Sequence, residues 1–348
     1  MPRKSAKSRK PRTGGKPKFD SAQTFTDEMI ASLEAVKSDP KAWSAPWTSM
    51  ARYGMPRNGN SGRIYRGILN LWQLLGKCSR EGWTDNRWFT YKGAQSVGGQ
   101  VRKGEKGTYV HAWNFSVSWE DMQGNRVWRP TAAQKASGQV KCVGQRPFLK
   151  IWKVFNADQC DGIAALPEAP QVDPAELYAT AVAALDLLPV TVRHGSNVAC
   201  YSPSSDEITM PEPGQFDSVE AYLATRFHET GHWTGAKSRM DRDLTGRFGS
   251  DSYAMEELVA ELTSAFLCGH FGIEGQGLQH PKYLAHWLRV LKADKYAIFK
   301  PARMATEAAN FILAGGVKVA VADEPTATAD AANTAPDSEG DQTLASAA

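Results

Sequence analysis

The chain has 348 residues, 22% of them charged, and a formal net charge of +4. No apolar run approaches the roughly 18–20 residues that a membrane helix needs, and the polar, basic start has no signal-peptide core, so we expect neither a membrane protein nor a secreted one. The five cysteines are widely spread and form no C-x-x-C pair, which argues against a disulfide framework. We therefore expect a cytoplasmic protein that is long enough for two domains.

The two ends of the chain carry opposite charge. Residues 1–18 hold eight Lys or Arg and no acid, whereas the chain from Asp323 onward holds six acids and no base. Because both ends are also rich in small and polar residues, we expect a disordered basic arm over 1–19 and a disordered acidic tail over 318–348. The basic arm either attracts nucleic acid non-specifically or is a solvated segment, and both interpretations remain open.

Residues 20–165 are predicted to form a mixed α+β domain. Apolar residues at helical spacing indicate helices, and alternating apolar and polar residues indicate strands. The predicted elements are a helix over 25–36, a loop over 42–60, a helix over 65–75, a helical turn over 92–97, and strands over 108–119, 126–128 and 148–155.

Two features of this first domain predict nucleic-acid binding. The stretch 98–107 is rich in glycine, which lets a backbone approach a ligand closely, and its basic side chains suit phosphates. Nine of the eleven tryptophans lie in residues 1–152 among basic residues, and aromatic faces in a basic groove hold single-stranded nucleic acid. The candidate contacts are Arg63, Tyr65, Arg66, Arg87, Trp88, Tyr91, Lys92, Arg102, Lys103 and Lys106. The alternatives are a solvated glycine-rich hairpin and tryptophans that serve only the core.

Residues 166–174 contain three prolines and are interpreted as a linker, after which residues 175–317 form a second domain. The strand predicted over 206–211 is expected at the edge of a small sheet, either as a plain edge or as one that pairs with an extended peptide. The elements predicted before it are a helix over 174–187 and strands over 190–193 and 199–201.

The second domain contains the motif H-E-x-x-H, in a helix predicted to begin at Ser218. Positions i and i+4 lie on one face of a helix, so His228 and His232 can bind one metal ion. Glu229 can reach a water on that metal without being a ligand, which makes it the candidate general base. This is the arrangement of a zinc hydrolase helix, and Zn²⁺ is the expected cofactor.

A zinc site of this kind needs a third protein ligand. Glu257 and Glu261 share one face of a later helix beside an apolar stripe, where an acid needs a partner. We assign Glu257 as the third ligand and Glu261 as an acceptor for the free N–H of a ligating histidine. The reverse assignment and a solvated acidic face remain open. Glu256 points about 100° away from this face and is expected in solvent.

A family resemblance rests on four ordered segments of the first domain: 63–72 (RIYRGILNLW), 87–92 (RWFTYK), 98–107 (GGQVRKGEKG) and 154–160 (VFNADQC). They resemble the N-terminal domain of ArdC-type antirestriction proteins, a domain also found in TraC-type plasmid primases. In the second half, 201–203 (YSP), 228–235 (HETGHWTG), 238–242 (SRMDR) and 247–249 (RFG) are similar to the same family. The resemblance implies a domain that binds single-stranded DNA, followed by a zincin-like metallopeptidase domain.

Two functions follow from these expectations. In one, a zinc metallopeptidase acts on a protein or peptide and is brought to single-stranded DNA by the first domain. In the other, the protein coats plasmid or phage DNA and shields it from nucleases, with zinc only stabilising the fold. A primase is disfavoured because no acidic polymerase-type cluster is evident.

Overall fold

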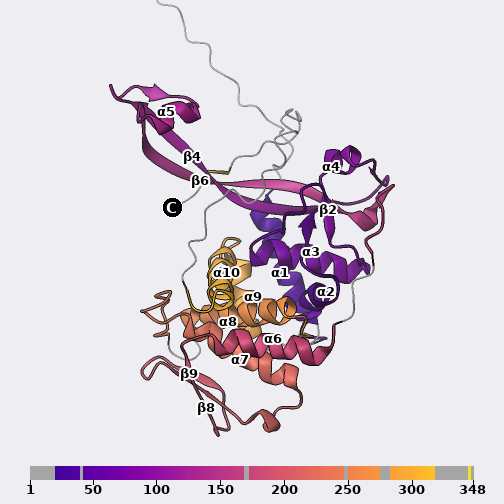
Figure 1. Ribbon diagram of the computed structural model, residues 1–348, viewed down its shortest axis with the longest axis vertical. Coiled ribbons are helices and arrows are strands. Elements are labelled where there is room, and N and C mark those ends of the chain that lie inside the picture. The colour runs from indigo at the N-terminus through magenta and orange to yellow at the C-terminus, as the bar shows by residue number, and fades with distance from the viewer. Residues whose placement is uncertain are drawn as a thin grey trace, which may run out of the picture.

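The computed structural model describes residues 20–39, 42–167, 172–246, 250–274, 283–317 and 344–345. A helical body carries a long two-stranded arm at one end and a small sheet at the other (Figure 1). The predicted basic arm and acidic tail lie outside the described residues, apart from the short strand β11 (Leu344–Ala345), which pairs with β6 (Val140–Asn156).

The first half of the chain supplies part of the helical body and the whole of the arm. Its helices are α1 (Ser21–Ala35), α2 (Ala45–Tyr53), α3 (Ile68–Glu81), α4 (Tyr91–Ser96), α5 (Ala132–Ala136) and the short η2 (Ala157–Gln159). Its strands are β1 (Arg57–Asn58), β2 (Arg87–Phe89), β3 (Gln100–Val101), β4 (Thr108–Asp121), β5 (Arg126–Val127), β6 and β7 (Cys160–Asp161).

The helix α2 occupies residues 45–53 of the loop predicted over 42–60, so that prediction was wrong over this part. Pro46 lies in the first turn, where its missing N–H is not needed and its fixed φ suits the helix. Trp47 and Met50 then turn the same face inward and are each at most 2% exposed. The prolines and glycines of this segment therefore bound a short buried helix rather than a loop.

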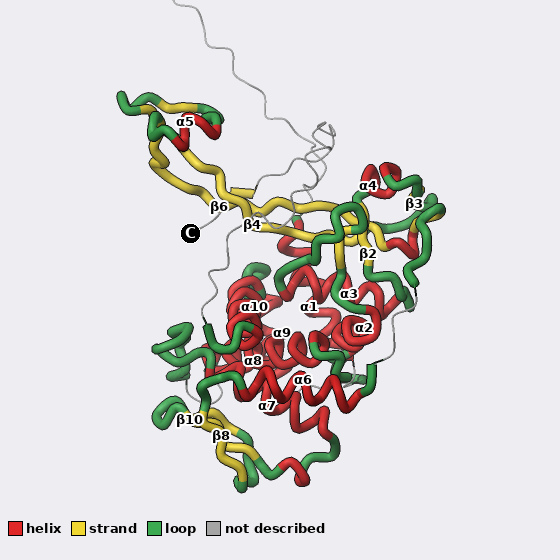
Figure 2. Tube along the Cα trace, viewed as in Figure 1, coloured by secondary structure: helices red, strands yellow, loops and turns green. Residues whose placement is uncertain are grey.

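The arm is a hairpin of β4 and β6, which pair antiparallel from Thr108↔Val154 out to Asp121↔Val140. Both predicted strands are confirmed and are longer than predicted, and the strand predicted over 126–128 is present as β5, which pairs with β4. The sheet order is β1-β2-β6-β4-β5, so the base of the arm is anchored by β2 beside the helical body (Figure 2).

The second half of the chain forms the rest of the body and the small sheet. Its elements are α6 (Pro174–Asp186), β8 (Thr191–His194), β9 (Cys200–Ser202), β10 (Glu207–Met210), η3 (Pro213–Gln215), α7 (Val219–Trp233), α8 (Asp251–His270), α9 (Leu284–Ala293) and α10 (Phe299–Leu313). The three predicted strands are confirmed, but the order β8-β10-β9 places β10 in the centre. The expectation that strand 206–211 is an edge was wrong: β9, which forms an antiparallel hairpin with it, takes an edge.

The two halves share one hydrophobic core. Trp47 of α2 contacts Phe266 of α8 edge to face, with ring centroids 6.2 Å apart, and also contacts Trp72 of α3. Gly269 of α8 permits this approach, because a Cβ there would lie 3.0 Å from the carbonyl oxygen of Trp47. The predicted linker at 166–174 therefore joins two segments that are packed together, and helices of the first half brace the helices of the second.

No helix among the described residues is both long and apolar enough to cross a membrane.

Because the core is shared, we expect Trp47→Ala to lower the free energy of unfolding by about 3–5 kcal/mol, the usual cost of removing a buried aromatic ring. Urea titration followed by circular dichroism and by tryptophan fluorescence should still give one coincident transition, since both halves lose the same contacts. Trp128→Ala is the matched control, because Trp128 is 76% exposed and its loss should change stability by about 0.5 kcal/mol or less. Two separate transitions in the wild type would contradict a shared core.

Candidate metal centre

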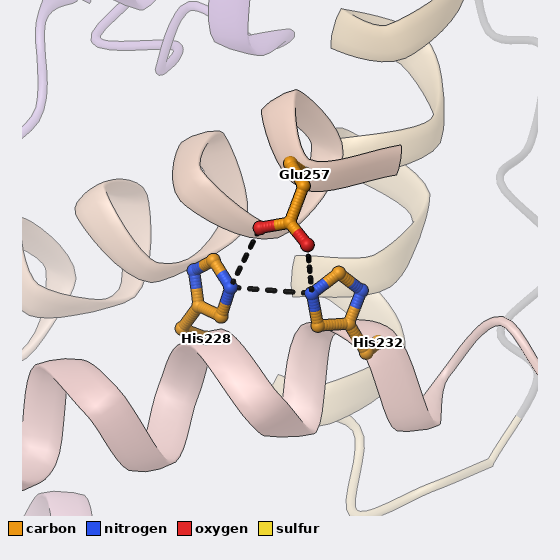
Figure 3. Close-up of side chains that lie close together, drawn as sticks. All are labelled: His228, His232 and Glu257. Atoms are coloured by element: carbon orange, nitrogen blue, oxygen red, sulfur yellow. Dashed lines mark hydrogen bonds and ion pairs between the residues drawn. The ribbon is translucent and has the colours of Figure 1, made fainter. Parts of the chain in front are cut away.

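The metal site is built on two packed helices, α7 and α8. The side chain of Ser218 accepts a hydrogen bond from the backbone N–H of Ala221 and starts α7, as predicted. Gly231 lets α8 come close, because a Cβ at this position would lie 3.2 Å from Cα of Ala260. This contact sets Glu257, one turn earlier on α8, above the histidine face of α7 (Figure 3).

The structure brings His228, His232 and Glu257 together as predicted. The two Nε2 atoms are 3.2 Å apart, and the carboxylate of Glu257 lies 3.5 Å from Nε2 of His228 and 3.8 Å from Nε2 of His232 (Figure 3). Ligand bonds of about 2.0–2.1 Å at a tetrahedral angle place neighbouring ligand atoms about 3.3–3.4 Å apart. The three donors therefore lie close to the spacing that a small divalent cation requires.

The charge of the site also suits a cation. Glu229 and Glu257 are 5% and 2% exposed, so two carboxylates are buried beside the histidines. Burial by itself would lower the pKa of His232, but the hydrogen bond that its ring donates to Glu256 and the charges of Glu229, Glu256 and Glu257 raise it overall. Buried negative charge of this kind is stabilised when a metal ion is bound.

Glu229 is held away from the ligand set by the small sheet. Its Oε2 accepts a hydrogen bond of 2.8 Å from the backbone N–H of Tyr201, in the edge strand β9. The carboxylate is thus oriented by a main-chain donor while it stays next to His228 in the sequence. This position suits a group that takes and releases a proton rather than a metal ligand.

Glu256, predicted to be solvated, is instead the acid that orients His232. Its Oε1 lies 3.2 Å from Nδ1 of His232, so a histidine that ligates through Nε2 donates its Nδ1–H to this carboxylate. The expectation for Glu256 was wrong because His232 and Arg242 provide partners for its carboxylate away from solvent. Glu261, predicted for this role, is buried on α8 at 2% exposure, and its part in the site stays a prediction.

Arg242 was missed by the sequence reasoning and completes this set. Its Nε and Nη2 donate to the two oxygens of Glu256 at 2.9 and 2.7 Å, and Nη2 also donates to the carbonyl of Gly231. Burial by itself would raise the pKa of Glu256, but the hydrogen bonds from His232 and Arg242 lower it overall, which keeps the carboxylate ionised. The only signal in the sequence is an acid next to the presumed ligand on a buried helix, which needs a cation nearby.

A second arginine holds the small sheet against the end of α7. Nε of Arg239 donates to the carbonyl of Trp233, and its guanidinium stacks 4.0 Å above the Trp233 ring. The same guanidinium bonds Asp206, which also accepts a hydrogen bond from the hydroxyl of Tyr201. Since Tyr201 donates to Glu229 through its backbone, this cluster positions the candidate base.

Three of the predicted DNA contacts lie around one open cavity of about 470 Å³ at the base of the arm, namely Tyr91, Arg102 and Lys103. Tyr91 is 47% exposed and offers part of its ring to a ligand. Arg102, however, is already bonded to Glu105 and to the carbonyl of Asp158. The cavity therefore has fewer available cations than the sequence indicated.

The other predicted DNA contacts are scattered. Trp88 is 0% exposed in a small cluster with Leu74, so the prediction that its ring stacks on a base was wrong. The guanidinium of Arg87 is committed to Asp85 and to a backbone carbonyl. Tyr65 is half-buried against the core, and burial raises its pKa to about 12. Exposed side chains occur at Arg63, Arg66 and Lys106, and Lys92 is half-buried.

We expect Glu256→Gln and Arg242→Lys each to weaken divalent-metal binding by about 10–100-fold, because the partner that orients a ligating histidine is lost or loosened. Isothermal titration with Mn²⁺ and with Zn²⁺ measures this directly. The matched control is Arg193→Lys, which alters an exposed arginine–glutamate pair with Glu207 far from the ligands in sequence and should leave affinity unchanged. Equal affinities in all variants would contradict the proposed orienting role.

Comparison with known proteins finds a match for each half of the chain. A family model described as the N-terminal domain of anti-restriction factor ArdC matches residues 19–155, and one described as a zincin-like metallopeptidase matches residues 179–304. Two proteins named DNA primase TraC from Escherichia coli are 39% and 38% identical over 81% and 82% of this chain. The chain spans only 26% and 20% of their lengths.

Other relatives are matched over nearly their whole length. A protein from Sinorhizobium fredii named Uncharacterized protein y4eC is 36% identical, over 84% of this chain and 91% of its own. The metal-free crystal structure of the antirestriction ArdC protein from plasmid R388 is 37% identical, with a TM-score of 0.64 over 86% of this chain and 98% of that one. Its Mn(II)-bound structure is 36% identical with the same TM-score. The chain therefore belongs to the ArdC family of antirestriction proteins, with an ArdC-type N-terminal domain and a zincin-like metallopeptidase domain.

Proposed function

We propose that this protein binds single-stranded DNA through its first half and cleaves protein through the metal centre of its second half, and so protects mobile-element or phage DNA. The observation that carries the proposal is the position of Glu229, a buried carboxylate beside three preorganised metal donors and hydrogen-bonded to an edge strand. A purely structural metal site has no need of this fourth group. The kinship with ArdC and with TraC primases supports the DNA-binding part.

The metal that we propose is Zn²⁺, held by His228, His232 and Glu257. Two imidazoles and one carboxylate are a common ligand set of catalytic zinc, with the fourth position left for water. A Mn(II)-bound ArdC shows that a relative takes another divalent ion, so the test compares both metals. When bound, the cation supplies the positive charge that lowers the pKa of a water molecule towards about 7.

Different residues of the chain then carry out proton transfer, ligand orientation and substrate binding. Glu229 accepts a proton from the attacking water and passes it to the leaving amine, while the N–H of Tyr201 keeps the carboxylate in place. Glu256 and Arg242 hold the ring of His232. The edge strand β9 lies beside Glu229, where an extended peptide can pair with it.

A second function is favoured by one observation, which is that α7 and α8 are central to the core. Phe227, Trp233 and Leu258 are each at most 1% exposed, so a cation that ties α7 to α8 also stabilises the fold. In this alternative the protein coats DNA and the metal is structural. The substitution of Glu229 distinguishes the two functions.

We expect Glu229→Gln to keep metal and DNA binding, because the side chain has the same shape and is not a ligand. Protein hydrolysis should fall by about 10²–10⁴-fold, the usual contribution of a general base. The measurements are metal content, binding of a labelled oligonucleotide, and cleavage of an unfolded protein with single-stranded DNA present. If DNA transfer into a restricting host is protected equally by wild type and variant, catalysis is not the antirestriction mechanism.

We expect added Zn²⁺ to raise the melting temperature of the wild type, since binding to the native state at about 100 times Kd stabilises by about 2.7 kcal/mol. His232→Ala removes a ligand and should abolish that rise. Differential scanning fluorimetry with zinc or manganese, checked by elemental analysis of metal content, measures both. Equal zinc content in wild type and His232→Ala would exclude the assigned site.

A further inference from the structure

The arm, which comprises residues 108–156, extends away from the helical body. β4 and β6 run side by side along its length, and β5 and α5 lie at its tip (Figures 1 and 2). Fourteen paired residues of β4, at about 3.4 Å each, give a ribbon on the order of 45 Å long. A two-stranded ribbon of this length has little hydrophobic core of its own. Its length therefore suggests that its surface binds a partner.

The charge of the arm is strongly one-sided. It contains seven Lys or Arg and two acids, a net charge of +5. Residues 1–18 carry +8 and the chain from Asp323 carries −6, so everything outside these three segments has a net charge of −3. Between the two ends of the chain, net positive charge is therefore concentrated on the arm, while the remainder is slightly acidic.

The seven cations of the arm are exposed, and none of them forms a salt bridge with another described residue. They are Arg126, Arg129, Lys135, Lys141, Arg146, Lys150 and Lys153. Several arginines outside the arm are paired instead, as Arg87 and Arg102 show by bonding Asp85 and Glu105. The charge of the arm is thus available to an external partner.

Aromatic rings accompany these cations. Arg126 lies 4.2 Å from the ring centroid of Trp128, which is 76% exposed near the tip. Similar pairs repeat along the ribbon, with Lys135 over Trp119, Lys150 over Trp152 and Lys153 over Tyr109. Alternating cations and rings are what a flexible strand with free base faces requires, whereas a duplex keeps its base faces stacked inside.

We infer that the arm is the main surface on which single-stranded DNA lies, with its cations on phosphates and Trp128 stacked on a base. The inference deepens the proposed function, on which it rests, and moves the DNA contact from most of the residues singled out in the sequence to the hairpin. The burial of Trp88 and the pairing of Arg87 with Asp85 then leave this DNA-binding surface unaffected.

The test compares two variants that lose the same charge. The arm variant is Lys141→Gln, Arg146→Gln, Lys150→Gln and Lys153→Gln. The control variant is Arg52→Gln, Arg289→Gln, Lys292→Gln and Arg303→Gln, four exposed cations outside the arm that each pair with an acid. Binding of a fluorescent single-stranded oligonucleotide is measured by anisotropy over a range of salt concentrations, and retained Mn²⁺ binding reports that each variant is folded.

We expect the arm variant to bind at least tenfold more weakly at low salt, and the slope of log K against log salt to fall by about 0.7 for each phosphate contact removed. The control variant should stay within about twofold of wild type. Trp128→Ala should weaken binding by about fivefold or more, through the loss of one stacked base. If both charge variants bind with the wild-type affinity and the wild-type salt slope, the inference about the arm is overturned, while the proposed function still stands.

Two further outcomes are informative. A duplex of equal length that competes as well as the single strand would overturn the assignment to single-stranded DNA. Absence of DNA binding by the wild type would instead refute the proposed function itself, so failure at either level can be recognised.

Discussion

The contact on which the site depends is the close packing of α7 against α8 at Gly231 and Ala260. It places the carboxylate of Glu257 close enough to two histidines of the neighbouring helix for the three residues to share a metal ion. Arg242 closes the same joint, because it bonds the carbonyl of Gly231 and the carboxylate of Glu256 with one guanidinium. Burying this charged cluster is costly unless every member is paired, so the cluster tolerates little displacement of either helix.

The shared core connects the two halves mechanically. Through α2 the first half packs on α8, the helix that carries Glu257, with Trp47 and Phe266 at the junction. The arm leaves the body at the opposite end from the small sheet that holds Glu229 (Figure 1). In this arrangement one end is positively charged and bears the exposed ring of Trp128, while the other holds buried carboxylates, so the two proposed activities occupy separate surfaces of one folded unit.

Local patterns predicted what depends on nearest neighbours along the chain. The spacing of His228 and His232 and the cap at Ser218 needed only helix geometry, and the strands of the arm needed only alternation. The predictions that failed concern side chains whose surroundings come from distant segments. Trp88 is enclosed by α3 and β6. Glu256 of α8 is bonded by Arg242, which lies fourteen residues earlier in the loop before that helix.

The sequence by itself determined the ligand helix, the nature of its donors, the elements of the arm and the family resemblance, because each depends on residue type at fixed spacing. Only the tertiary structure decided that α2 is a buried helix, that β10 is central, and that Glu256 contacts His232 instead of lying in solvent. It also decided which cations have an acidic partner and which do not. Pairing of charges is settled by contacts between distant segments, and only the folded chain shows that none of the seven cations of the arm has an acidic partner among the described residues.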